Sequence, residues 1–464
     1  MLDSRPNILY IMTDDHAAHA ITAYGSVINE TPNIDRIANE GARFDNVFCG
    51  NAICAPSRAT ILAGNHSHIN GVLTLADRFD GRQPTFPKAM QAAGYQTAIF
   101  GKWHLGHGGE ADPTGFDTWT VLPGQGDYHD PTFFVQGEEQ RFEGYVTDLI
   151  TDFSIDWLEQ RDPERPFLLK VHHKAPHRPW DPDEKHEHLY EDIDIPIPET
   201  FDDDYATRPA AEAAEMRVGR DMTFRDLKEP PPKGLSPEET RRWAYQRYIK
   251  DYLRCVASVD DNVGRLLDWL DDNGLAENTV VVYTSDQGFF LGDHGWYDKR
   301  FMYEESLRMP FLMRYPPEIE ANSVVDAIVS NIDFGPTFLD YAGLEAPEMM
   351  QGASFREVAK GNVPEEWQES IYYRYWMHLA NHGVAAHYGV RTATHKLIYY
   401  YGRALGTSDS VDQDTEQYWE LFDLEADPKE LNNVYGKPDY TEVQEALHAE
   451  LARLRQRYGD TDAV

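Results

Sequence analysis

Short apolar runs alternate with longer stretches of helical periodicity through the first three quarters of the chain. The run Asn-Ile-Leu-Tyr-Ile-Met at 7–12 and the run Thr-Val-Val-Val-Tyr-Thr at 279–284 have the continuous hydrophobicity of strands buried on both faces. Residues 146–161 and 241–273 instead repeat apolar positions with the period of an amphipathic helix. Strands that alternate with helices predict an α/β fold with a large, mostly parallel sheet sandwiched by helices.

The other elements of this first part follow the same alternation. Residues 181–240 are rich in Asp, Glu and Pro, and they include three consecutive prolines at 230–232. Such a composition predicts a long excursion over the surface rather than a core element. The remaining predicted elements are strands at 96–100, 166–171 and 311–315 and a helix at 333–342.

The pattern changes after about residue 345. Residues 371–376 and 388–401 alternate apolar and polar positions, and no helix of the kind that connects parallel strands is predicted between them. Residues 441–458 are predicted to form a charged amphipathic helix. We therefore predict a main domain over residues 1–345 and a smaller C-terminal α+β subdomain over residues 346–464, packed on it and containing an antiparallel sheet.

Composition limits the possible binding partners of the protein and its possible cellular compartment. The net charge of −37 argues against nucleic acid, which would be repelled. No run of about 18 apolar residues is present, so no membrane span is predicted. The first residues lack the basic-then-apolar order of a signal peptide, and Cys49, Cys54 and Cys255 are too few for a disulfide framework. These features predict a cytoplasmic protein, unless a leader has been removed from a secreted one.

The stretch Cys-Ala-Pro-Ser-Arg at 54–58 has the features of an anion site at the start of a helix. Unpaired N–H groups and the helix dipole favour negative charge there, and Pro56 is tolerated in the first turn. Arg58 lies one turn from Cys54 on the same side, so it can hydrogen-bond an approaching anion. An isolated pattern of this kind is more often a buried structural cysteine, so the assignment depends on the rest of the chain.

Acidic and amide side chains follow two of the predicted strands. Asp14 and Asp15 come after the first strand, and Asp286 and Gln287 come after the strand at 279–284. Ligands bind at the carboxyl ends of the strands in parallel sheets, and oxygen donors suit calcium or magnesium rather than zinc. A single Asp-Asp pair is more often a turn or a helix cap, but two such clusters at equivalent positions favour a metal site.

These motifs together resemble type I sulfatases, the formylglycine-dependent members of the alkaline-phosphatase-like superfamily. Besides 54–58, the chain has Gly-Lys-Trp-His at 101–104, Ala-Pro-His-Arg-Pro at 175–179 and Asp-Lys-Arg-Phe-Met-Tyr-Glu at 298–304, in the order that the family shows. The layout looks most like carbohydrate sulfatases such as N-acetylglucosamine 6-O-sulfatases. The resemblance covers most of the chain and implies an alkaline-phosphatase-like fold.

The resemblance implies a site built around one divalent cation, Ca²⁺ or alternatively Mg²⁺. Gln287 stands where the family has Asn, and Ala63-Gly64-Asn65 stands where it commonly has Thr-Gly and a basic residue. Cys54 would be converted to formylglycine by a formylglycine-generating enzyme. The implied metal ligands are Asp14, Asp15, Cys54 as formylglycine, Asp286 and Gln287, and the implied catalytic residues are Cys54, Arg58, Lys102, His104, His177 and Lys299.

The implied activity is a sulfuric ester hydrolase that removes sulfate from a sulfated carbohydrate or an aryl sulfate. The hydrated formylglycine would attack sulfur, with Arg58 and Lys102 holding it. The leaving alcohol would take a proton from His177 or Lys299, and His104 would act as base in the second step. The alternatives are a phosphodiester or phosphonate monoester hydrolase of the same superfamily, and an unmodified sugar-binding homologue.

Aromatic residues near these motifs suggest a wall on which a sugar could stack. Trp180 follows the segment at 175–179, Trp296 precedes Lys299, and residues 372–376 are three tyrosines, one tryptophan and one arginine. The alternative is that these rings pack in the core, which we favour for 372–376. The sequence leaves open the sulfated position, exo or endo action, and the oligomeric state.

Overall fold

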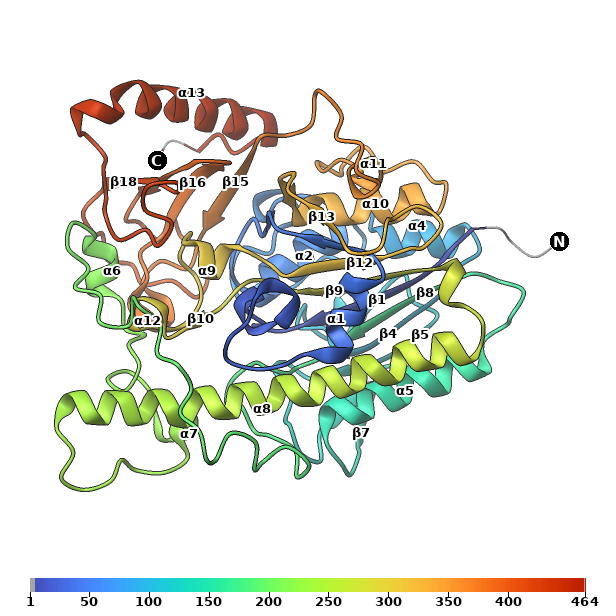
Figure 1. Ribbon diagram of the computed structural model, residues 1–464. Coiled ribbons are helices and arrows are strands. Elements are labelled where there is room, and N and C mark those ends of the chain that lie inside the picture. The colour runs from blue at the N-terminus through green and yellow to red at the C-terminus, as the bar shows by residue number, and fades with distance from the viewer. Residues whose placement is uncertain (1–4, 463) are drawn as a thin grey trace.

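Two main β-sheets organise the computed structural model, which describes residues 5–462 and 464 (Figure 1). The five central strands of the larger sheet are parallel, whereas strands at both sides of them join antiparallel, so the predicted large, mostly parallel sheet is confirmed. The larger sheet has the spatial order β13 (Ser323–Val325), β2 (Ala42–Phe44), β12 (Phe311–Arg314), β9 (Thr279–Ser285), β1 (Asn7–Thr13), β8 (Phe167–His172), β4 (Gln96–Lys102), β5 (Thr118–Leu122), β6 (Thr132–Val135) and β7 (Glu138–Arg141).

Helices cover both faces of the larger sheet, as predicted. The group α1 (Pro32–Asn39), α5 (Val146–Gln160) and α8 (Pro237–Asp272) packs on one face, and the group α2 (Cys54–Ala63), α4 (Phe86–Ala92) and α10 (Phe334–Tyr341) packs on the other (Figure 1). The long helix α8 begins at a capping box, in which Ser236 accepts from the backbone N–H of Glu239 and Glu239 accepts from that of Ser236. The short helices are α3 (Ser67–Asn70), α6 (Pro209–Ala213), α7 (Phe224–Leu227), α9 (Glu304–Leu307), α11 (Arg356–Ala359) and α12 (Ala380–Gly383).

The smaller sheet near the C-terminus is antiparallel, as predicted. Its order is β15 (Ser370–Tyr375), β16 (His387–Thr392), β17 (His395–Tyr400) and β18 (Tyr418–Asp423), and α13 (Thr441–Tyr458) lies across it at the upper left of Figure 1. Leu447, Leu451 and Leu454 of α13 recur at helical spacing and are buried in the cluster that joins the helix to this sheet.

Some elements were not predicted. Strands β5, β6 and β7, on the side of the sheet that ends in β7, are short, and β7 is fully exposed, so they lack the continuous apolar run of a strand buried on both faces. The predicted strand at 388–401 is two strands, β16 and β17, joined by a tight turn. Two further pairs are two-stranded, β3 (Val47–Phe48) with β14 (Val329–Ser330), and β10 (Phe290–Leu291) with β11 (Tyr297–Asp298).

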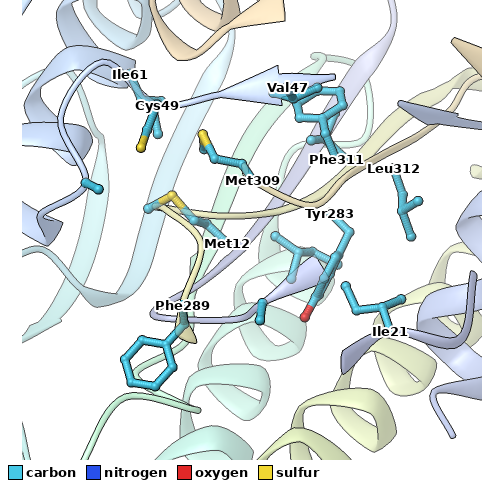
Figure 2. Close-up of a cluster of buried hydrophobic side chains, with 14 of the residues drawn as sticks. Met12, Ile21, Val47, Cys49, Ile61, Tyr283, Phe289, Met309, Phe311 and Leu312 are labelled. Carbon is cyan, nitrogen blue, oxygen red and sulfur yellow. The ribbon is translucent and has the colours of Figure 1, made fainter. Parts of the chain in front are cut away.

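The hydrophobic core continues up to the strand ends that carry the polar motifs. Met12, near the end of β1, packs in one buried cluster with Cys49, Ile61 and Tyr283, which come from three other parts of the chain (Figure 2). The same core cluster includes residues of both sheets, so the domain boundary at residue 345 stays a prediction. Among the described residues, no helix has the length and hydrophobicity needed to cross a membrane.

Candidate active site

The polar motifs meet at the carboxyl ends of four neighbouring strands. Asp14 and Asp15 follow β1, Asp286 follows β9, Lys102 ends β4, and the loop after β8 carries His177. These strands are adjacent in the order β9–β1–β8–β4, so their ends lie at one edge of the sheet, where ligands bind in parallel sheets. Asp15 and Gln287, which are 272 positions apart in the chain, thereby come into hydrogen-bonding contact.

Cys54 is the first residue of α2, and its side chain is buried. No side chain caps this end of the helix, because the N-cap residue is Ile53. The first-turn N–H groups therefore remain available to an anion next to Cys54. Burial, with the nearby Asp14 carboxylate, raises the pKa of the Cys54 thiol to about 12. The unmodified side chain is thus a thiol at neutral pH and a poor nucleophile.

Arg58 lies one turn into α2 and joins the two acidic clusters. Its guanidinium donates to Asp286 Oδ2 (2.9 Å), to Asp14 Oδ2 (3.1 Å) and to the carbonyl of Lys102 (2.7 Å). Burial and then repulsion from Asp14 raise the pKa of Asp286, and Arg58 opposes this shift. The guanidinium thus engages two carboxylates, and its predicted role toward an approaching anion stays a prediction.

A second group of contacts surrounds Asp15. Lys299 Nζ donates to both of its carboxylate oxygens (2.6 and 2.7 Å), Gln287 Nε2 donates to Oδ1 (2.6 Å), and His177 Nε2 lies 3.7 Å from Oδ2. Burial opposes the charged form of Lys299, but the anionic groups around it, Asp15 foremost, together outweigh burial and raise the pKa of the ammonium. Burial raises the pKa of Asp15 to about 7, with repulsion from Asp14 adding to it.

Lys102 and His104 approach from the end of β4. The Lys102 ammonium pairs with Asp14 Oδ2 and also donates to the amide oxygen of Gln125. Burial, and then the charge of Lys102, hold the pKa of His104 well below its usual range, so its imidazole is neutral. The Nδ1 atom of His104 is buried and has no hydrogen-bond partner among the described residues.

Two of these residues adopt a backbone conformation that side chains with a Cβ seldom take. Asp15 has φ 67° and His104 has φ 58°, both in the left-handed region. Such conformations cost about 1–3 kcal/mol each and persist where the surrounding structure holds them, often at functional sites. Here the hydrogen bonds of Asp15 with Lys299 and Gln287 stabilise its left-handed conformation.

The carboxylates fit a hard divalent cation. One oxygen of each of Asp14, Asp15 and Asp286 lies within 4.8 Å of the others. Asp14 Oδ1 and the amide oxygen of Gln287 are buried and have no hydrogen-bond partner among the described residues. Unpartnered oxygens of this kind are costly without a donor or cation, and four oxygen donors suit Ca²⁺ or Mg²⁺. Cys54 Sγ belongs to the same region, because it lies within 4.8 Å of ligand atoms of Asp14 and His177.

The prediction that aromatic rings near the motifs form a wall for sugar stacking is wrong for the rings that the structure buries in the core. Trp180 and Trp296 are completely buried, and Trp296 is stacked between Tyr205 (ring centres 5.3 Å apart) and Phe301 (4.9 Å). The side chain of Tyr373 is also fully buried. These rings pack in the core because large aromatic surfaces gain most from leaving water.

Two supporting contacts of the site were missed from the sequence. Gln125, which accepts from Lys102, lies after β5, a strand that was not predicted. Asn331 Nδ2 donates to Ser57 Oγ (3.0 Å), which in turn donates to the backbone carbonyl of Asp286. The pair Gly124 and Gly126, both with positive φ, was the available signal for a tight loop around Gln125.

Two family profiles match the chain. The sulfatase profile covers residues 6–344, and a profile described as N-sulphoglucosamine sulphohydrolase, C-terminal, covers residues 292–457. N-acetylglucosamine-6-O-sulfatase of Bacteroides thetaiotaomicron is 43% identical over 99% of this chain and 88% of that protein. The arylsulfatase of Clostridium perfringens is 28% identical over 98% of this chain and 96% of that protein.

Solved structures share the fold over nearly the whole chain. A protein in complex with its substrate D-glucosamine-2-N,6-O-disulfate matches with a TM-score of 0.93 and 43% identity over 99% of both chains. The phosphonate monoester hydrolase of Agrobacterium radiobacter matches with a TM-score of 0.77 over 98% of this chain and 96% of that one, but its 22% identity shows the fold alone. The chain therefore belongs to the sulfatase family, in the alkaline-phosphatase-like superfamily, and is a sulfuric ester hydrolase.

Proposed function

We propose that this sulfatase removes the 6-O-sulfate from glucosamine-type sugars, including N-acetylglucosamine 6-O-sulfate. The observation that carries the proposal is the likeness, at 43% identity over 99% of both chains, to a structure that holds D-glucosamine-2-N,6-O-disulfate as its substrate. The 43% identity to a protein named N-acetylglucosamine-6-O-sulfatase supports the same sugar and position.

We assign the reactive position to Cys54, after its oxidation to formylglycine by a formylglycine-generating enzyme. In a hydrated formylglycine a hydroxyl is the nucleophile toward sulfur, and a divalent cation, for which we favour Ca²⁺, would polarise that hydroxyl. The buried Cys54 thiol could not attack by itself at neutral pH, since burial raises its pKa to about 12. Asp14, Asp15, Asp286 and Gln287 are the proposed ligands of the cation.

The charged side chains around Cys54 bind and orient the sulfate group. We propose that Lys102 and Lys299 bind sulfate oxygens once a cation engages their present partners, Asp14 and Asp15. Arg58 keeps Asp14 and Asp286 oriented toward the same point. Fixed cations of this kind stabilise the negative charge that develops on the transferred group.

Two histidines are suited to proton transfer. The Nδ1–H of His177 is donated to the carbonyl of Arg178 (2.8 Å), which leaves Nε2 free to exchange a proton on the side of Asp15. We propose that the leaving alcohol takes its proton from Lys299, or from His177 Nε2 in the imidazolium form, which burial disfavours and a bound sulfate anion would favour. His104, held neutral by burial and by Lys102, is the proposed base for the step that releases sulfate.

The first experiment measures the mass of the intact protein and its activity on position isomers. Conversion of Cys54 to formylglycine lowers the mass by roughly 18 Da, as expected for oxidation of a thiol to an aldehyde. The converted protein should release sulfate from glucosamine 6-O-sulfate and N-acetylglucosamine 6-O-sulfate faster than from the 3-O-sulfate or N-sulfate isomers. Faster hydrolysis of a phosphonate monoester would favour the phosphonate hydrolase alternative, and an unconverted Cys54 in protein from its native host would favour a sugar-binding homologue.

A matched pair of cysteine variants tests the assignment of Cys54. Cys54→Ser should lower turnover by more than about a thousandfold, because it removes the precursor of the nucleophile. Cys49→Ser is the control, since Cys49 is equally buried but packs in the hydrophobic core. Undiminished turnover of Cys54→Ser, with the metal retained, would overturn the assignment.

A further inference from the structure

Lys174 is a buried lysine that forms no ion pair with any carboxylate of the described residues. Its residue is only 1% exposed, and the ammonium lies 4.7 Å from the centre of the Tyr128 ring. Among the described residues, no ion pair or hydrogen bond to this ammonium is present. An unpaired charge in such a place is costly, so it needs either an aromatic face or an anion that arrives later.

The loop that carries Lys174 runs alongside the catalytic groups. Lys174 stands two residues after β8, the carbonyl of the following Ala175 accepts from the N–H of Asp14 (3.4 Å), and the carbonyl of Lys174 accepts from the N–H of His177 (3.0 Å). Tyr128, whose ring faces the ammonium, donates its hydroxyl to the carbonyl of His177 (2.6 Å). The backbone and one aromatic ring therefore tie Lys174 to His177 and Asp14.

The other cations of the site are in a different state. Arg58, Lys102 and Lys299 are each paired with a carboxylate of Asp14, Asp15 or Asp286. Their charges are partly cancelled before a sulfate ester arrives, and the chain as a whole carries −37. An anionic substrate gains most from a cation whose charge is not already balanced, because the interaction acts through a partly dry interior.

The electrostatic surroundings of Lys174 agree with this geometry. Burial, and then repulsion from Lys102, lowers the pKa of Lys174 to about 7, while Asp14 opposes the shift. The other groups that face it are Arg225 of α7, which lowers its pKa, and Cys255 of α8, which raises it. A sulfate anion bound nearby would favour the protonated form of the lysine.

We propose that Lys174 is a further anion-binding residue of this site, and that its unneutralised ammonium tightens the binding of the sulfate ester and of inorganic sulfate. The role requires only sulfate ester hydrolysis, and it does not depend on the proposed 6-O-sulfated sugar. It acts on binding more than on the chemical step, because the charge is present before and during the transfer.

The test compares Lys174→Met and Lys174→Arg with Lys170→Met. Lys170 is the matched control: it is 2% exposed, lies 4.9 Å from the rings of Tyr10 and Phe86, and burial lowers its pKa to about 7 as well. For each variant, kcat and KM are measured on a sulfate ester that the wild type hydrolyses, together with the inhibition constant of inorganic sulfate.

Lys174→Met should raise KM and the inhibition constant of sulfate by about tenfold with kcat nearly unchanged, as expected for the loss of one charge near the anion. Lys174→Arg should restore both values, and Lys170→Met should change neither. Above pH 7 the KM of the wild type should rise as the free ammonium loses its proton, and this rise should be absent in Lys174→Arg.

An inhibition constant for sulfate that is the same in Lys174→Met and the wild type would overturn the proposal. Equal losses in Lys174→Met and Lys174→Arg would also overturn it, because they would indicate a purely structural role. If the wild type does not hydrolyse glucosamine 6-O-sulfate, the sugar assignment is wrong. The role of Lys174 is then still decided by the inhibition constants of sulfate in the wild type and the variants.

Discussion

Replacing Arg58 with methionine should destabilise the metal-free protein strongly. Arg58 is 3% exposed, and its guanidinium donates to Asp286 (2.9 Å), to Asp14 (3.1 Å) and to the carbonyl of Lys102 (2.7 Å). Methionine fills a similar volume but leaves two buried carboxylates near each other without the cation that joined them. Breaking a buried ion pair by removing one partner costs about 3–5 kcal/mol, so we expect a loss of unfolding free energy in that range.

The size of this effect should depend on calcium. A divalent cation bound by Asp14 and Asp286 would take over the charge that Arg58 supplied, so adding Ca²⁺ should stabilise Arg58→Met more than the wild type. Ligand at about 100 times its dissociation constant stabilises a protein by about 2.7 kcal/mol, which is enough to reveal such a difference. Activity should be lost in the variant under both conditions, because Lys102 also loses its backbone contact with Arg58.

The assay is urea unfolding followed by tryptophan fluorescence, first in EDTA and then in Ca²⁺. A loss of 3–5 kcal/mol should lower the midpoint by about 1 M or more. Arg36→Met is the control, since Arg36 pairs with Asp268 (2.7 Å) and Asp271 (2.9 Å) at the surface and should change the unfolding free energy by no more than about 1 kcal/mol. The reasoning is refuted if both variants lose the same small amount in EDTA, or if Ca²⁺ leaves the difference between them unchanged.

Two further substitutions test the backbone and the pH response. Gly101→Ala should lower the unfolding free energy by at least about 2 kcal/mol and remove most of the activity, because φ is 104° and an added Cβ would lie 2.0 Å from the carbonyl oxygen of His172. Gly108→Ala is the control. Its φ is 82° and no atom lies within 4 Å of an added Cβ, so it should cost about 1 kcal/mol in the same unfolding assay. His387 accepts from the N–H of Met302 (3.2 Å) and burial lowers its pKa to about 4, so this group alone should cost the folded protein up to about 3 kcal/mol as the pH falls from about 6.5 to 4. His387→Gln should lose less over that range, and parallel urea midpoints in the two proteins would contradict the assignment.

Much of the sheet could be predicted because its central strands are buried on both faces. In β1 and β9 every residue is buried, so the apolar run is continuous and the strand is evident from local sequence. Strands β5, β6 and β7, toward one side of the sheet, are partly or fully exposed, and they carry no such signal. Gln125 was missed for this reason, since its place in the site depends on the end of β5.

The roles of individual cations could not be predicted from their motifs. The Arg58 motif predicts a role toward an approaching anion, but it does not indicate that the packing of α2 against the ends of β1 and β9 places Arg58 between two carboxylates. Lys174 follows no motif that distinguishes it from a solvated lysine, and only its burial over Tyr128 separates it from one. Trp296 was expected near a sugar, but stacking between Tyr205 and Phe301 keeps it in the core.

By itself, the sequence determined the class of fold and the chemical type of the site, and it predicted most of the charged groups that meet there. Apolar periodicity reports burial within each strand and helix, and motif spacing reports which groups follow each strand, because both are local properties of the chain. Only the tertiary structure decided which charges neutralise one another, since Asp14, Arg58 and Asp286 are joined by contacts across 44 and 228 positions of sequence. The free energy of a buried charge depends on its partners and its desolvation, and both are defined only when the distant segments have packed together.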